Sequence, residues 1–181
     1  MRQRMEKAIF LDIDLCSGCG ACAVACMDQN DLYPEKGQPA FRRIYKVEDG
    51  RFPDAGIAYF SAACLHCEDS PCLMGCPTGA ITRDSRTQAV RVDKDLCIGC
   101  KSCALACPFG VPRYDAEGKM QKCGLCAERV EAGLLPACVR VCPTGALRFE
   151  AADKVLAEKE YKFAGNIVSA ARRRWAAGEA T

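Results

Sequence analysis

The sequence lacks the features that mark most enzymes. It has one histidine, and aromatic residues make up only 7% of its 181 positions. It contains no Gly-rich dinucleotide fingerprint, no nucleophile elbow, and no paired carboxylates near the lone histidine. These absences argue against a substrate-converting site, and we expect a non-catalytic chain.

The sequence also lacks a charge excess and a long apolar run. Lys and Arg number 25 against 23 Asp and Glu, so no large basic field points to nucleic acid. A spanning helix needs about 20 consecutive apolar residues, and none is present. The N-terminal apolar stretch, residues 8–11, ends at Asp12 and is too short for a signal-peptide core. We therefore expect no direct membrane span and a cytoplasmic location, with a periplasmic one only if a partner with its own export signal carries the chain.

Cysteine is the abundant residue, with 16 in the chain. This density is typical of a disulfide scaffold or a metalloprotein, and disulfides rarely persist in a reducing cytoplasm. The cysteines fall into four complete groups of four, which favours metal sites. The groups are Cys16, Cys19, Cys22, Cys26 (one); Cys64, Cys67, Cys72, Cys76 (two); Cys97, Cys100, Cys103, Cys107 (three); and Cys123, Cys126, Cys138, Cys142 (four).

The groups reveal an internal repeat. Groups one and three share the spacing C-x2-C-x2-C-x3-C, and an apolar-rich segment precedes each at the same offset, residues 8–15 and 89–96. Groups two and four end alike, in CPTGAI at 76–81 and CPTGAL at 142–147. The pattern predicts two copies of one unit that arose by duplication.

The segments between the cysteines predict a small α+β protein with short elements. A hairpin is expected from residues 80–83 and 89–93 around a polar turn, and a helical tail from 151–177. Other expected strands are 8–12, 41–47 and 57–60, and single helical turns are expected at 23–26 and 104–107.

The spacing favours iron–sulfur clusters over zinc. Zinc sites commonly take two C-x2-C pairs from separate segments, whereas here three cysteines recur at every third position. A fourth cysteine follows after three intervening residues, as in the bacterial ferredoxin run. In that run the fourth cysteine ligates the other cluster. Proline follows Cys76, Cys107 and Cys142, as in that run, but Met27 follows Cys26. Sixteen thiolates at four per centre predict four [4Fe–4S] clusters, and a structural zinc module remains the alternative.

Clusters would change the charge of the protein. Each oxidised cubane with its four thiolates carries −2, so the formal +2 becomes roughly −6. Because the polypeptide has few other core residues, we expect cluster binding and folding to be coupled.

The sequence resembles a known family, the four-cluster electron-transfer subunits of molybdenum and tungsten oxidoreductases. The resemblance is to subunits of the dimethyl sulfoxide reductase type. The resemblance spans residues 8–150. Besides the cysteines it rests on FRRIY at 41–45, CLHC at 64–67, CIGC at 97–100, ACPFG at 106–110 and KCGLC at 122–126.

The resemblance implies two ferredoxin-like modules related by a pseudo-twofold axis, with crossed pairing of the cysteine groups. Residues 1–27 with 117–150 would form the first module, and 64–116 the second. Residues 28–63 would be an insertion that docks the partner, and 151–181 a helical tail. The implied ligand sets are Cys16, Cys19, Cys22, Cys142 (cluster a); Cys123, Cys126, Cys138, Cys26 (cluster b); Cys97, Cys100, Cys103, Cys76 (cluster c); and Cys64, Cys67, Cys72, Cys107 (cluster d).

The resemblance also implies a function and a partner. The chain would relay single electrons to or from a large catalytic subunit with a molybdenum or tungsten pterin cofactor, with a further redox subunit as an additional partner. Two alternatives within redox biology stay open. One is a ferredoxin-like subunit of a tungsten aldehyde oxidoreductase or a hydrogenase complex, and the other is a free-standing polyferredoxin.

Three other features have a functional and a plainer interpretation. His66 is either an ordinary loop residue or a group that tunes a cluster or passes protons. Residues 41–45 are either core or a docking strand. The basic segment 172–175 either grips an acidic partner or complements the dipole at a helix end.

Overall fold

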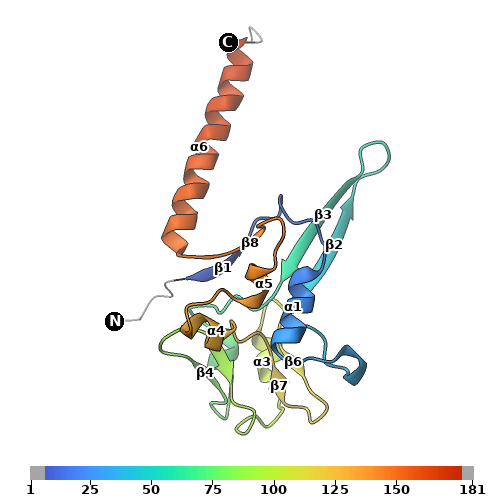
Figure 1. Ribbon diagram of the computed structural model, residues 1–181, viewed down its shortest axis with the longest axis vertical. Coiled ribbons are helices and arrows are strands. Elements are labelled where there is room, and N and C mark those ends of the chain that lie inside the picture. The colour runs from blue at the N-terminus through green and yellow to red at the C-terminus, as the bar shows by residue number, and fades with distance from the viewer. Residues whose placement is uncertain (1–6, 177–181) are drawn as a thin grey trace.

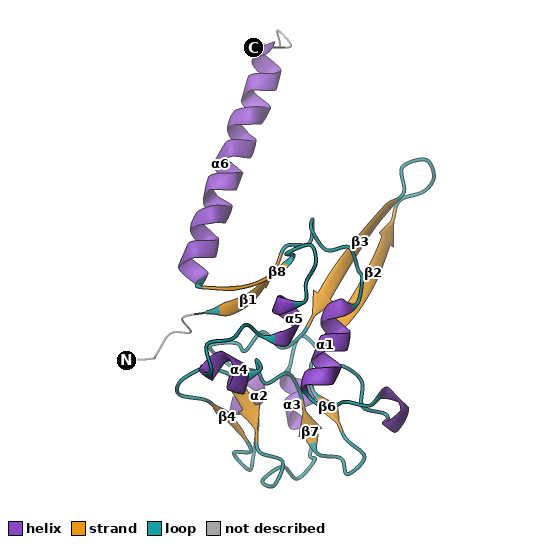
Figure 2. Ribbon diagram, viewed as in Figure 1, coloured by secondary structure: helices purple, strands orange, loops and turns teal. Residues whose placement is uncertain are grey.

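The computed structural model describes residues 7–176 and has the expected α+β character, with short helices and strands (Figures 1 and 2). The strands are β1 (Ala8–Leu11), β2 (Arg43–Asp49), β3 (Gly56–Ala62), β4 (Ile81–Arg83), β5 (Val90–Val92), β6 (Arg113–Tyr114), β7 (Met120–Gln121) and β8 (Leu147–Glu150). The helices are α1 (Ala21–Gln29), the 3-10 helix η1 (Pro34–Lys36), α2 (Pro71–Met74), α3 (Ser102–Ala106), α4 (Ala127–Glu131), α5 (Ala137–Arg140) and α6 (Ala152–Ala176).

The strands form antiparallel pairs: β1 with β8, β2 with β3, β4 with β5, and β6 with β7. The β1–β8 pair joins the two ends of the cysteine-rich region, with Ile9 opposite Phe149 and Leu11 opposite Leu147. The β4–β5 pair is the expected hairpin, with Ile81 opposite Val92. The first pair therefore brings the segment before group one next to the segment after group four.

Several elements differ from expectation. Strands β6, β7 and β8 and the short helices η1, α2, α4 and α5 were not predicted, and α1 is nine residues long rather than a single turn. The residue after the last cysteine of each run explains the helix lengths. Pro108 follows Cys107, and α3 ends at Ala106; Met27 follows Cys26, and α1 continues to Gln29. Proline cannot supply the N–H that continues a helix, whereas methionine can.

The buried core is built around cysteines. One cluster of buried residues contains Cys97 and Cys103 with Met120, and a second contains Cys22 and Cys138 with Leu147. A third joins Ala89, Leu125 and Ala127. Thiol groups thus occupy positions that larger apolar side chains fill in an ordinary domain.

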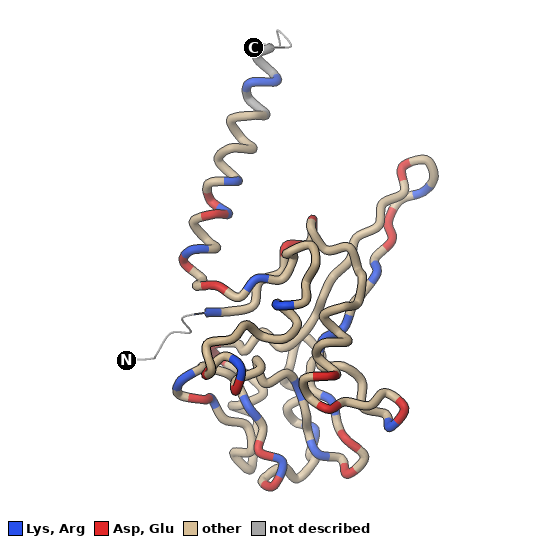
Figure 3. Tube along the Cα trace, in the orientation of Figure 1, with Lys and Arg blue, Asp and Glu red and all other residues tan. Residues whose placement is uncertain are grey.

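Two elements project from the body, the β2–β3 hairpin and helix α6 (Figure 1). Val155 is the one buried side chain among those described in α6. Arg148 Nη1 anchors the start of α6 through an ion pair with Glu158 Oε2 at 2.6 Å. Basic and acidic positions are interspersed on both projections (Figure 3). Among residues 7–176, no helix combines the length and apolar character that crossing a bilayer requires.

Candidate metal centres

All sixteen cysteines are free thiols, and the fold brings members of different groups together. One pocket is bordered by four of them, three from the start of group one and the last of group four: Cys16, Cys19, Cys22 and Cys142. Gly18 and Gly20 also border it, with φ angles of 70° and 79°. These left-handed conformations suit glycine and turn the loop back between successive cysteines.

A second pocket has the same pattern of bordering cysteines, supplied by groups two and three. It is bordered by three cysteines of group two and the last of group three: Cys64, Cys67, Cys72 and Cys107. His66, Val90, Phe109 and Val111 provide other parts of its wall. In each pocket, therefore, three cysteines come from one group and the fourth comes from a different group.

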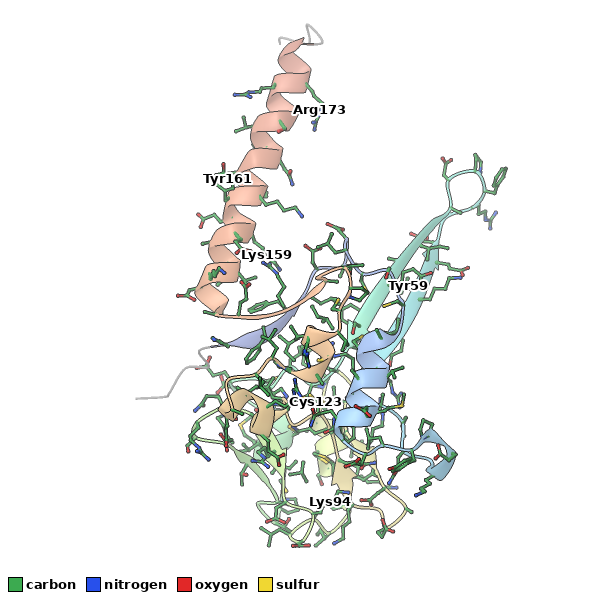
Figure 4. The ribbon with its side chains drawn as sticks, in the orientation of Figure 1. Tyr59, Lys94, Cys123, Lys159, Tyr161 and Arg173 are labelled. Carbon is green, nitrogen blue, oxygen red and sulfur yellow. The ribbon has the colours of Figure 1, made fainter. Side chains whose placement is uncertain are left out.

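Cys26, Cys123, Cys126 and Cys138 are connected by electrostatic effects on one another's thiols, Cys123 through Cys26. Burial, together with the neighbouring thiols of Cys138 and Cys126, raises the pKa of the Cys26 thiol to about 11. Burial also raises the pKa of Cys123 to about 12, and Cys26 acts on it in the same direction. Cys123 lies in the middle of the body (Figure 4).

The remaining four cysteines gather around β4, α3 and β7. Cys97 and Cys103 are in one buried cluster with Met120, and Cys76 packs against that cluster. The hydroxyl of Tyr114 lies 3.3 Å from Cys103 Sγ. A hydrogen bond with the Ser102 side chain lowers the pKa of the exposed Cys100, and negative charge on Cys76 opposes this effect.

The donors suit iron–sulfur clusters. Burial disfavours thiolates at Cys26 and Cys123, so a bound cationic iron core is the natural means of ionising them. Main-chain N–H groups of His66, Met120 and Leu125 each lie 3.4 Å from the sulfur of Cys64, Cys97 and Cys123, respectively. Such N–H···S contacts are typical of cluster loops and tune their potentials. Within residues 7–176, no three His, Cys, Asp or Glu side chains are placed as ligands of a single metal ion.

His66 is a loop residue, but it is buried, with only 1% of its surface exposed. Its Nδ1 accepts the N–H of Val90 at 3.0 Å, so the proton of the neutral ring is on Nε2. Burial, aided by the charges of Lys122 and Arg83, lowers the pKa of His66 to about 3. Its Nε2 has no hydrogen-bond partner among the described residues, which leaves a buried donor available beside the second pocket.

Three cations lie near these sites that the sequence pattern did not single out. Arg42 and Lys122 are buried, and Arg83 donates to carbonyls of the group-two loop at Cys67 and Glu68. Each falls in or near a motif noted above, but only Lys122, which precedes Cys123, stands directly beside a cysteine in the sequence. In the segment 41–45, the side chain of Arg42 is therefore buried, and the two residues on either side of Arg42 are half-buried. Of the segment 172–175, Arg172 and Arg173 are exposed, and the side chains of Arg174 and Trp175 lie outside the described residues.

Comparison with protein families identifies two matches, both described as a 4Fe-4S dicluster domain. One covers residues 15–81 and the other residues 55–152. Together they include all sixteen cysteines.

Individual relatives cover most of the chain. A chain of the anaerobic dimethyl sulfoxide reductase of Escherichia coli (strain K12) is 42% identical over 159 residues, which are 83% of this chain and 76% of that protein. A sulfite dehydrogenase subunit of Allochromatium vinosum is 39% identical over 163 residues, 80% of this chain and 68% of that protein. The hydrogenase-2 operon protein HybA of Escherichia coli O157:H7 is 36% identical over 183 residues, 86% of this chain and 55% of that protein. The chain therefore belongs to the 4Fe-4S dicluster family and is an iron–sulfur subunit of the dimethyl sulfoxide reductase type.

Proposed function

We propose that this chain is a non-catalytic electron-transfer subunit that holds four [4Fe–4S] clusters and relays single electrons to or from a catalytic partner. The observation that carries the proposal is the composition of the two pockets. Each is bordered by the first three cysteines of one group and the last cysteine of another. This is the ligand pattern of paired clusters in ferredoxin-type runs.

The proposed ligand sets follow the pairing of the groups. Cluster a takes Cys16, Cys19, Cys22 and Cys142, and cluster d takes Cys64, Cys67, Cys72 and Cys107. Cluster b takes Cys123, Cys126, Cys138 and Cys26, and cluster c takes Cys97, Cys100, Cys103 and Cys76. The two pockets support sets a and d, and the mutual effects of neighbouring thiols on their pKa values support set b.

The two CPTGA segments support the proposed duplication. Cys76 Sγ lies 3.7 Å from Thr78 Oγ1, and Cys142 Sγ lies 3.7 Å from Thr144 Oγ1. Gly79 and Gly145 have φ angles of 66° and 67°. We infer two ferredoxin-like modules, residues 1–27 with 117–150 and residues 64–116, with 28–63 as an insertion and 151–181 as a tail.

The chain's own residues would hold the clusters and shield them from water. When bound, the clusters supply one-electron redox chemistry. Apolar side chains such as Leu147 beside the first pocket and Val90 beside the second limit solvent access. The N–H groups that point at cysteine sulfur stabilise negative charge there, which favours the reduced state.

The relatives suggest what the catalytic partner is. Two are named as subunits of dimethyl sulfoxide reductase and sulfite dehydrogenase, which favours a partner with a molybdenum or tungsten pterin. The hydrogenase-2 relative supports a hydrogenase complex as a second candidate. We propose the β2–β3 hairpin as the docking element, because it projects from the body and exposes Tyr45, Val47 and Ile57.

Purification without oxygen, metal analysis and EPR test the proposal. We expect about sixteen iron atoms per chain and four reducible cubanes after dithionite treatment. A protein with zinc, or with fewer than four cubanes, would contradict it. The large subunit that copurifies distinguishes the pterin enzyme from the hydrogenase.

Paired ligand variants test the crossed pairing. Cys142→Ser and Cys19→Ser should perturb the same EPR signal, and Cys107→Ser and Cys67→Ser should both perturb a different one. If Cys142→Ser instead perturbs the signal that Cys126→Ser perturbs, the proposed ligand sets are wrong.

A further inference from the structure

Arg42 is a buried cation between two cysteine groups. Only 4% of its surface is exposed. Its Nη1 donates to the carbonyl oxygen of Ser61 at 3.1 Å and to Ser61 Oγ at 3.0 Å. Ser61 Oγ lies 3.5 Å from Cys22 Sγ, so the guanidinium is one residue away from the first pocket.

Arg42 contacts the wall of the first pocket. Ser61, which accepts both of its hydrogen bonds, borders that pocket together with Cys16, Cys19, Cys22 and Cys142. These four cysteines are set a, so Arg42 lies beside the site of cluster a.

Lys122 is a second buried cation, with 7% of its surface exposed. Its Nζ donates to the carbonyl oxygens of Val90 and Cys123, the latter at 3.1 Å. Val90 borders the second pocket, together with Cys64, Cys67, Cys72 and Cys107. Lys122 thus lies between Cys123 of set b and the pocket of set d.

The described contacts of these cations are to neutral oxygens. Among residues 7–176, the described salt bridges to Asp and Glu are formed by other cations. A buried charge without a counter-ion is strongly unfavourable, so such charges are normally paired. Each oxidised cubane with four thiolates carries −2, which is the opposite charge that these two positions require.

We propose that Arg42 and Lys122 are internal counter-charges that raise the reduction potentials of the clusters beside them, Arg42 for cluster a and Lys122 for clusters b and d. The inference depends on the proposed function, because it assigns a role toward the clusters. Reduction takes each cluster from −2 to −3, and a nearby fixed cation stabilises the more negative state.

A redox titration of the anaerobically purified protein, followed by EPR, tests the proposal. Arg42→Gln removes the charge and keeps a donor for Ser61, and Lys122→Gln does the same for Val90. Arg42→Gln should lower the reduction potential of one of the four clusters, and Lys122→Gln should lower those of two others. We expect about a tenfold loss in the ratio of reduced to oxidised cluster at a fixed potential, which is about 59 mV for one electron. Arg42→Lys should restore the wild-type steps.

The controls remove the same charges from exposed positions. Arg51→Gln acts at the tip of the β2–β3 hairpin and Lys159→Gln on α6, and neither should move any step. If Arg42→Gln fails to retain its clusters, Lys122→Gln decides the question. Four cubanes with unchanged steps in the glutamine variants would overturn this inference and leave the proposed function intact. Fewer than four cubanes in the wild-type protein would instead overturn the proposed function.

Discussion

The ring of Tyr59 on β3 packs directly against the backbone of Gly18 in the first cysteine run. A Cβ atom on Gly18 would lie 2.3 Å from Cδ1 of Tyr59, well inside van der Waals contact. Figure 4 shows Tyr59 on the lower part of the projecting hairpin. The insertion therefore covers the loop that supplies three cysteines to the first pocket.

This contact predicts that Gly18→Ala disrupts the first pocket. The Cβ atom forces either the loop or Tyr59 to move, in addition to the strain of a φ angle of 70°. Gly20→Ala is the matched control, because Gly20 has a similar φ but open space around it, and we expect a cost of about 1 kcal/mol there. Iron content and EPR should show loss of one cubane in Gly18→Ala alone. The double variant Gly18→Ala/Tyr59→Ala should recover it, and equal effects of the two glycine variants would contradict the prediction.

Arg83 stabilises the loop of group two. Its guanidinium donates to the carbonyls of Cys67 and Glu68 and to Ser70 Oγ, the last at 2.9 Å. Arg83→Gln should destabilise this loop by about 2 kcal/mol, because a shorter neutral side chain cannot serve these acceptors together. The measurement is the rate at which visible absorbance is lost under a chelator.

The matched control for Arg83 is Arg91→Gln on β5. Arg91 is exposed, and its described ion pair is a long contact to Asp84, with 3.9 Å between Nη1 and Oδ2. Surface pairs of this kind contribute about 0–1 kcal/mol, so the rate should barely change. A similar acceleration in both variants would refute a specific role of Arg83.

Asp115 should contribute stability that is constant near neutral pH. The Oδ2 atom of Asp115 lies 2.8 Å from Lys94 Nζ, and its Oδ1 atom accepts a hydrogen bond from the main-chain N–H of Lys119 at 2.8 Å. The hydrogen bond with Lys94 lowers the pKa of the Asp115 carboxyl group. Because Lys94 is half exposed, we expect Asp115→Asn to cost only about 1 kcal/mol. The contribution is complete above the ordinary pKa of about 3.9 and is lost as the pH falls through the lowered value.

Thermal unfolding of the anaerobic protein tests this pH dependence. The difference in stability between wild type and Asp115→Asn should stay the same from about pH 8 down to about pH 5. A difference that changes between about pH 6 and pH 8 would assign the effect to a histidine-like group instead.

The outer part of α6 should be dispensable for cluster retention. The described contacts of α6 with the body come from its first half, through buried Val155, the Glu158–Arg148 pair and a 3.8 Å contact of Lys162 with Asp14. Deletion of residues 163–181 should therefore leave iron content and thermal stability unchanged. Val155→Asp should instead destabilise the protein by about 2–3 kcal/mol, because it buries an unpaired carboxylate. Loss of iron on truncation would show that the outer helix supports the fold.

The sequence predicted the β4–β5 hairpin and the end of α3 because their causes are local. The spacing of cysteines, the turn after Arg83 and the proline after Cys107 act within a few residues. Strand β8 was missed although Leu147–Glu150 alternates apolar and charged residues, because its partner β1 lies at the other end of the chain. The burial of Arg42 and Lys122 also depends on distant residues, Ser61 and Val90. An isolated segment such as FRRIY cannot reveal which of its arginines turns inward.

The two cysteine pockets close at different points in translation. The pocket of Cys64, Cys67, Cys72 and Cys107 draws its wall from one continuous stretch of chain. The pocket of Cys16, Cys19 and Cys22 needs Cys142, so a ribosome must release most of the polypeptide before that site can be completed. Three thiols of the first pocket are therefore synthesised long before their fourth ligand, whereas the second pocket has all four of its cysteines once residue 107 has been added.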